Sequence, residues 1–171
     1  MPEILDLYDK NRKLAGKTHI RGNPFEVGDY YLVADIWTVT PNGFILIDKR
    51  HPQKSFGGQW ECTGGAVTAG EDSATGAIRE LKEELGIEAE KAELRLIHTC
   101  RLSNKFVDTY LLIKNIDLEN LRLQAEEVTE AKLVTFRELE EIIASGQLSI
   151  SSGRFDDYSH VIEEYVKQAR S

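Results

Sequence analysis

The sequence has few cysteines and no long apolar run. Only Cys62 and Cys100 occur among 171 residues. Two cysteines are too few for a disulfide framework, and they lack the CxxC spacing of a metal site, so we expect buried thiols in a reducing compartment. No window approaches the ~20 apolar residues of a membrane helix, and the amino terminus does not resemble a signal peptide. We therefore expect a cytoplasmic protein with no membrane partner.

Positive charge is also scarce. Lysine and arginine total 21 against 29 acidic residues, which gives a net charge of −8. This balance disfavours nucleic acid polymers and anionic membranes as partners. It does not exclude a small anionic substrate that is held by a local cation or a metal ion.

No repeat and no linker rich in proline or glycine divides the chain. The composition is 41% hydrophobic and 29% charged, which is ordinary for a globular protein. The length suits one domain, so we expect a single domain over residues 1–171. Residues 1–30 are expected to form an N-terminal extension, a hairpin packed on that domain.

Apolar periodicity and turn residues predict a mixture of strands and helices. The expected strands are 4–8, 13–18, 31–40, 44–49, 60–63, 94–101, 106–114 and 132–134, and the expected helices are 74–85, 135–144 and 159–169. Strands and helices follow one another without a regular βαβ rhythm. This order predicts the α/β class, with a mixed sheet covered by helices.

The helix expected over residues 74–85 has an acidic face. At roughly 100° per residue, Glu80, Glu83 and Glu84 gather on one side, away from the apolar stripe. Like charges at these spacings destabilise a bare helix by a few tenths of a kcal/mol each. A solvated acidic face is the ordinary interpretation, but clustered carboxylates also suit a hard cation such as Mg²⁺.

Glycines surround this acidic face. Gly64 and Gly65 precede the helix, where they would allow unusual backbone angles and close approach of a ligand to the backbone. Gly76 falls on the acidic face, so we expect the helix to be bare where a ligand approaches.

The spacing of these residues follows a known pattern. Gly65 is followed after five residues by Glu71, after seven more by Arg79-Glu80-Leu81, and then by Glu83-Glu84-Leu85-Gly86-Ile87. The segment from Gly65 to Ile87 resembles a complete Nudix box. The resemblance implies the Nudix fold, an α/β/α sandwich with a mixed β-sheet. It also implies hydrolysis of a diphosphate linkage in a nucleoside diphosphate derivative or a related small diphosphate.

The resemblance further implies a metal site. Glu80, Glu83 and Glu84 would be ligands of Mg²⁺ or Mn²⁺, and the carbonyl of Gly64 often joins them in this family. Many members of the family are dimers, so a homodimer is a further expectation, although the sequence does not determine the oligomeric state.

Three other residues take roles by the same resemblance. Glu71 and Arg79 would form the pair that orients the metal-binding helix. A glutamate from a downstream loop often serves as base or extra ligand, and Glu126 and Glu127 are the candidates, with Glu127 preferred. A solvated acidic loop is the alternative for these last two residues.

A second resemblance is to Nudix proteins related to isopentenyl diphosphate isomerase. It rests on Leu7-Tyr8-Asp9, Trp37, Asn42-Gly43, Arg50, Lys54 and Trp60. In those proteins basic residues at positions like Arg50 and Lys54 hold the substrate diphosphate, although either could be an ordinary surface cation.

The isomerase chemistry itself is not expected. Counted from Trp60, the isomerase cysteine would fall at Gly65, three residues beyond Cys62, and two metal-binding histidines would fall at Tyr31 and Val67. Hydrolysis is therefore preferred. Isomerase-like chemistry and a non-catalytic module that senses a nucleotide or diphosphate are the alternatives.

Overall fold

The computed structural model describes residues 2–149 and 154–171. Its strands are β1 (Ile4–Tyr8), β2 (Leu14–Ile20), β3 (Tyr31–Val39), β4 (Ile45–Arg50), β5 (Trp60–Glu61), β6 (Thr63–Ala66), β7 (Leu94–Leu102), β8 (Lys105–Ile113) and β9 (Val128–Val134). Its helices are α1 (Ser73–Leu85), α2 (Phe136–Ala144) and α3 (Phe155–Ala169), with short 3₁₀ turns η1 (Lys91–Glu93) and η2 (Leu118–Asn120).

A mixed seven-stranded sheet forms the centre of the molecule. Its main path runs β5-β4-β3-β8-β7, with β6 also paired to β3 and β9 to β4. Strands β3 and β8 are parallel, and the other pairs in this sheet are antiparallel. The prediction of a mixed sheet is therefore confirmed.

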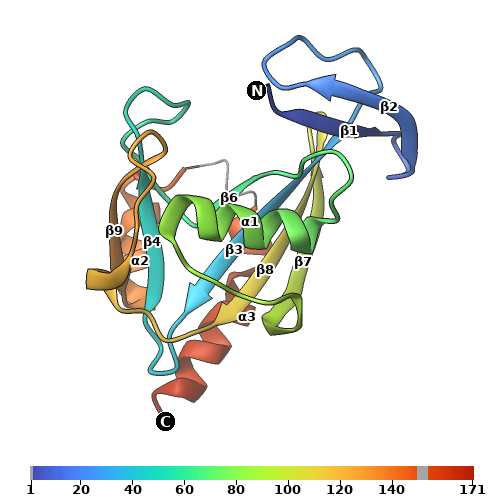
Figure 1. The fold of residues 1–171 in the computed structure, drawn as a ribbon. Helices are drawn as coiled ribbons and strands as arrows, with labels where there is room; N and C mark the ends of the chain where they lie inside the picture. Colours follow the sequence, from blue (N-terminus) through green and yellow to red (C-terminus); the bar gives the residue numbers. More distant parts are fainter. Residues whose placement is uncertain (1, 150–153) are drawn as a thin grey trace.

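Helices cover both faces of this sheet (Figure 1). On one face, α1 buries Ala77, Leu81 and Leu85 in a core that includes Ala34 and Ile36 of β3. On the opposite face, α2 and α3 pack on β3 residues that point the other way, such as Trp37. The alternation of side chains along β3 thus feeds two separate cores, as a three-layer α/β/α arrangement requires.

Helix α1 begins and ends at well-defined caps. The Asp72 side chain accepts a hydrogen bond from the backbone N–H of Thr75, and Gly86 adopts a left-handed conformation with φ 72°. The N–H of Gly86 then donates to the carbonyls of Leu81 and Lys82. These caps satisfy backbone groups that a helix leaves unpaired at its ends, and they fix the length of the acidic helix.

Three expected boundaries differ by three or more residues from the observed ones. Helix α3 begins at Phe155 rather than residue 159, and β9 begins at Val128 rather than residue 132. The extra turn of α3 packs Phe155 against Trp37, with ring centroids 5.1 Å apart. In addition, Gly64 and Gly65 lie in strand β6, where the sequence predicted only a short extended segment ending at Thr63. Contacts with distant segments, which local periodicity does not report, decide these boundaries.

The N-terminal residues form a separate two-stranded sheet of β1 and β2. This hairpin contacts the rest of the chain through an isolated bridge between Tyr8 and Tyr30 and a 2.8 Å hydrogen bond from the Ala69 N–H to the Ile4 carbonyl. The Arg12 guanidinium also forms a two-pronged ion pair with Asp108 of β8. Among the described residues, no helix is both long and apolar enough to span a bilayer.

Candidate functional site

A cavity of about 370 Å³ lies beside the acidic face of α1. Residues from the N-terminal hairpin, β4 and its following loop, β6, α1 and the loop before β9 line it. Its charged lining residues are Glu3, Arg21, Arg50, Lys54, Arg79, Glu80, Glu83, Glu84 and Glu127. The fold therefore gathers into one cavity the acidic helix, the preferred downstream glutamate and both predicted substrate cations.

Arg79 organises the first turns of the acidic face. Its Nε lies 3.1 and 3.2 Å from the two carboxylate oxygens of Glu71, and its Nη2 donates to the Ala66 carbonyl at 3.0 Å. Its Nη1 donates to Glu80 at 2.8 Å and to Glu83 at 3.1 Å. Burial disfavours the charge on Arg79, but the hydrogen bonds to Glu71 and Glu80 raise its pKa. The predicted contact between Glu71 and Arg79 is thus present, and its orienting role stays a prediction.

Glu84 lies among other buried acids. Only 9% of Glu84 is exposed, and burial together with the negative charges of Asp48, Glu80 and Glu61 raises its pKa to about 10. Burial and the charge of Glu61 likewise raise the pKa of Asp48 to about 8, although the Thr63 hydroxyl donates to one of its oxygens at 2.9 Å. A cation bound beside these acids would offset their mutual repulsion and favour their ionised forms.

The surroundings of strand β6 explain why residues 64 and 65 are glycines. Gly65 pairs with Ala34 of β3 and Gly64 with Asp35. A Cβ on Gly65 would lie 2.5 and 2.8 Å from the two carboxylate oxygens of Glu80, and a Cβ on Gly64 would lie 2.5 Å from Asp35 Oδ1. Neither glycine has a positive φ, so the expectation of unusual backbone angles is wrong. Close approach, here of a carboxylate to the backbone, is the physical reason for glycine.

Gly76 has a different role from the expected one. It is buried, and a Cβ there would lie 2.9 Å from the Val67 side chain. It therefore brings α1 close to the segment after β6, and it does not leave a bare patch for a ligand.

The donor set suits a hard divalent cation. The cavity offers glutamate carboxylates from α1 beside a strand backbone, and oxygen ligands of this kind are what Mg²⁺ and Mn²⁺ prefer. Within residues 2–149 and 154–171, no three side chains of His, Cys, Asp or Glu already surround a single point. Arg79 holds oxygens of Glu80 and Glu83 in this arrangement. The chemistry of the residues fits the metal that the sequence predicts.

The remaining predicted residues also reach the cavity. Lys54 forms an ion pair with Glu127, and both line it, whereas Glu126 is not among its lining residues. Arg50 donates to Glu61 at 2.6 Å and to the Ser55 carbonyl at 2.8 Å. Arg50 and Lys54 are therefore placed beside the acidic helix, and their contact with a substrate stays a prediction.

Sequence reasoning missed three residues of this site. Asp48 and Glu61 are acids in buried strands, each directly after a buried apolar residue, Ile47 or Trp60, and this pattern was a usable signal. Arg21 comes from the N-terminal segment and lines the cavity without any motif that marks it.

Comparison with known proteins identifies relatives over most of the chain. A family model described as the NUDIX domain matches residues 29–152. An uncharacterized Nudix hydrolase of Listeria monocytogenes is 37% identical over 147 residues, covering 85% of this chain and 87% of its own. Nudix hydrolase 3 of Arabidopsis thaliana is 32% identical over 151 residues, covering 80% of this chain and 20% of its own.

Solved structures have the same fold. DR0079 from Deinococcus radiodurans superposes with a TM-score of 0.72 at 21% identity, covering 99% of this chain and 100% of its own. A bifunctional NMN adenylyltransferase/ADP ribose pyrophosphatase from Francisella tularensis, complexed with AMP and a manganese ion, has a TM-score of 0.62 at 17% identity. That match covers 86% of this chain and 43% of the Francisella chain.

Proposed function

This chain belongs to the Nudix hydrolase family and is a Nudix-type pyrophosphohydrolase, and from that premise we propose that it depends on a divalent metal ion, Mg²⁺ or Mn²⁺. We propose as substrate a nucleoside diphosphate derivative or a related small diphosphate, cleaved at its diphosphate linkage. The observation that carries the proposal is the group of buried acids around Glu84, beside a glycine strand and facing an open cavity.

The residues that would hold the metal are Glu80, Glu83 and Glu84, with the carbonyl of Gly64. A divalent ion supplies positive charge to the diphosphate oxygens and makes a water molecule more acidic. Arg79, fixed by Glu71, keeps the glutamates of α1 aligned with β6 through its contact with the Ala66 carbonyl. These assignments explain why one arginine contacts three glutamates and a strand.

Other side chains would handle the water and the phosphates. The Glu127 carboxylate lines the same cavity as α1, where it would orient a water molecule for in-line attack on phosphorus and accept its proton. Arg50 and Lys54 would bind the non-bridging oxygens of the diphosphate. Lys54 now pairs with Glu127, so binding of substrate phosphate to Lys54 would release that carboxylate.

The test is hydrolysis of a panel of diphosphates with and without Mg²⁺ or Mn²⁺, with the phosphomonoester, pyrophosphate or phosphate products separated and quantified. The panel contains nucleoside triphosphates, nucleotide sugars, ADP-ribose, dinucleotides and isopentenyl diphosphate. ADP-ribose is included because the Francisella relative is described as an ADP ribose pyrophosphatase. We expect turnover only with metal, and a loss on the order of 100-fold or more in Glu84→Gln.

Glu88→Gln is the matched control, because Glu88 follows α1, is exposed and pairs only with Lys82 in the described contacts, at 3.0 Å. Unchanged turnover in Glu84→Gln would contradict the proposal. Tight metal-dependent binding without turnover would indicate a sensor, and deuterium exchange into isopentenyl diphosphate without phosphate release would indicate the isomerase. The homodimer and the cytoplasmic location stay predictions.

A further inference from the structure

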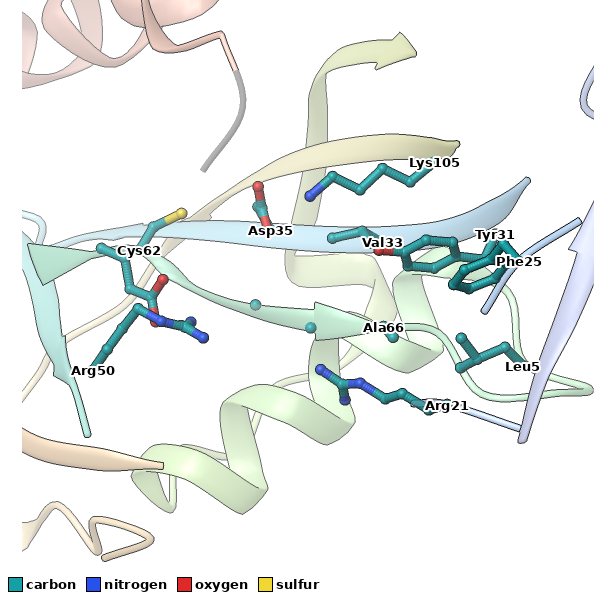
Figure 2. Close-up of a pocket in the computed structure, with 13 residues that line it drawn as sticks. Leu5, Arg21, Phe25, Tyr31, Val33, Asp35, Arg50, Cys62, Ala66 and Lys105 are labelled. Carbon is teal, nitrogen blue, oxygen red and sulfur yellow. The ribbon is translucent and has the colours of Figure 1, made fainter. Parts of the chain in front are cut away.

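A second cavity, of about 160 Å³, adjoins the first one (Figure 2). Arg21, Arg50, Gly64 and Gly65 line both cavities. A molecule with its diphosphate beside α1 could therefore extend past Gly64 and Gly65 into the second cavity. This continuity makes the second cavity the natural place for the group that is attached to the diphosphate.

One end of the second cavity is aromatic. The rings of Phe25 and Tyr31 stack with centroids 5.0 Å apart and an interplanar angle of 14°. His19 also stacks with Phe25, with ring centroids 3.9 Å apart. Phe25 and Tyr31 are each half-buried and line the cavity. Aromatic rings at this end of the cavity favour contact with a flat ring over contact with a flexible chain.

The other end contains a buried acid. Asp35 is 5% exposed, and its Oδ2 has no hydrogen-bond partner among the described residues. Figure 2 shows the Lys105 side chain extending toward Asp35. An unpaired buried carboxylate oxygen is costly, and it becomes favourable when a ligand donates a hydrogen bond to it. An isoprenoid tail has no such donor, whereas a nitrogen heterocycle can offer both an N–H donor for Asp35 and an acceptor for Lys105.

The N-terminal segment contributes to this second site. Leu5, Arg21 and Phe25 line the cavity, yet all three precede residue 29, where the family domain begins. Arg21 is held by Glu3 at 2.6 Å and is placed between the two cavities. Its guanidinium is therefore suited to the phosphate nearest the attached group.

We propose that residues 1–28 complete the substrate site. The second cavity binds a planar heterocycle with an N–H donor, of the nucleobase kind, between the aromatic pair and Asp35, while Arg21 binds the adjoining phosphate. This inference rests on the proposed function for its biological meaning. It can be tested without turnover, because nucleoside monophosphates contain the heterocycle and one phosphate but no scissile linkage.

The experiment is calorimetric titration of the full chain with AMP, GMP, CMP and UMP, and with ribose 5-phosphate and isopentenyl phosphate, in the absence of divalent metal. We expect at least one nucleotide to bind about tenfold or more tighter than either base-free phosphate. Phe25→Ala and Asp35→Ala should each weaken that binding about tenfold. Phe56→Ala, which removes an exposed ring that does not line this cavity, is the matched control and should bind unchanged.

Arg21→Ala provides a variant that is safe for folding, because about half of its side chain is exposed. It should weaken every monophosphate, with partial recovery in Arg21→Lys. The proposal is overturned if no nucleotide exceeds the base-free phosphates, or if Phe25→Ala and Asp35→Ala bind like the wild type. Nucleotide binding without turnover on the diphosphate panel would contradict the proposed function alone. Turnover that does not distinguish heterocyclic from base-free substrates would contradict this inference alone.

Discussion

Helix α1 and the β1–β2 hairpin face the same cavity, but they are held in the molecule in different ways. Ala77, Leu81 and Leu85 of α1 have no exposed surface, and the helix packs on the central sheet. Strand β2, by contrast, is exposed at nearly every position, and β1 and β2 form a sheet of their own. A two-stranded hairpin is only marginally stable without support from the domain.

The difference in packing between α1 and the hairpin matches two different requirements, metal binding and recognition of the group attached to the diphosphate. Residues that must share one cation need fixed positions, and a helix in the core provides them. Residues that recognise the attached group can lie on an element with lower local stability. On the proposed assignments, the chemistry belongs to the family domain, and the segment before it contributes Arg21 and Phe25 to selectivity.

The largest effect on stability is expected from a substitution that creates a cavity in the core beneath α1. Leu81→Ala should lower the free energy of unfolding by about 2–5 kcal/mol, because Leu81 is fully buried in a packed core. Leu5→Ala removes an equally buried leucine from the hairpin, and it should mainly speed hydrogen exchange over residues 4–20. Denaturant unfolding and native-state exchange measure both effects. Equal losses of global stability would show that the hairpin and the domain unfold as one unit, and would contradict a lower local stability of the hairpin.

Adding a methyl group where β6 contacts α1 tests whether the metal-binding glutamates need fixed positions. Gly65→Ala should reduce metal-dependent turnover by about 10- to 100-fold, since the new methyl group would displace the Glu80 carboxylate. Gly70→Ala is the control. No atom lies within 4 Å of its Cβ position, but φ is 86°, so this change should cost stability and leave metal dependence intact. Full activity in Gly65→Ala would mean that the close approach is dispensable.

The attachment of the hairpin depends on Asp108. Its carboxylate accepts from Arg12, from the Ser73 hydroxyl at 2.6 Å and from the Thr99 hydroxyl at 2.8 Å. Asp108→Asn should weaken the ion pair with Arg12 and cost about 1–3 kcal/mol. We expect faster proteolysis within residues 9–22 before the domain is cleaved. Thr99→Val, which removes a partner of Asp108 and leaves Arg12 in place, should have a smaller effect.

The smallest effect is the pH dependence of that same attachment. Burial disfavours the Asp108 carboxylate, but the hydrogen bonds from Arg12 and Ser73 outweigh it and lower its pKa. A lowered folded-state pKa contributes stability that is complete above the unfolded value, about 4, and is lost as pH falls through the folded value. The stability difference between wild type and Asp108→Asn should therefore shrink below about pH 4. A difference that stays constant between pH 6 and pH 3 would exclude Asp108 as the titrating group.

Some parts of the candidate site were predictable because their signals are local. The spacing of Glu80, Glu83 and Glu84 predicted a common helix face, and in the structure all three line one cavity. The partnership of Glu71 with Arg79 came from the family pattern, and the structure has the contact. The choice of Glu127 over Glu126 was only a preference, because the loop before β9 has no periodicity that indicates which side chain turns inward.

The sequence by itself determined the element types, the acidic face of α1 and the family, because capping, periodicity and motif spacing all act within a few turns or residues of chain. Only the tertiary structure decided that Asp48 and Glu61 lie beside Glu84 and that Arg21 and Phe25 line one cavity with Asp35. Those neighbours are brought together by the pairing of β3 with β6 and β8 and by the docking of the hairpin. Such contacts depend on which distant strands pair and in which register, and no local pattern in the chain encodes that choice.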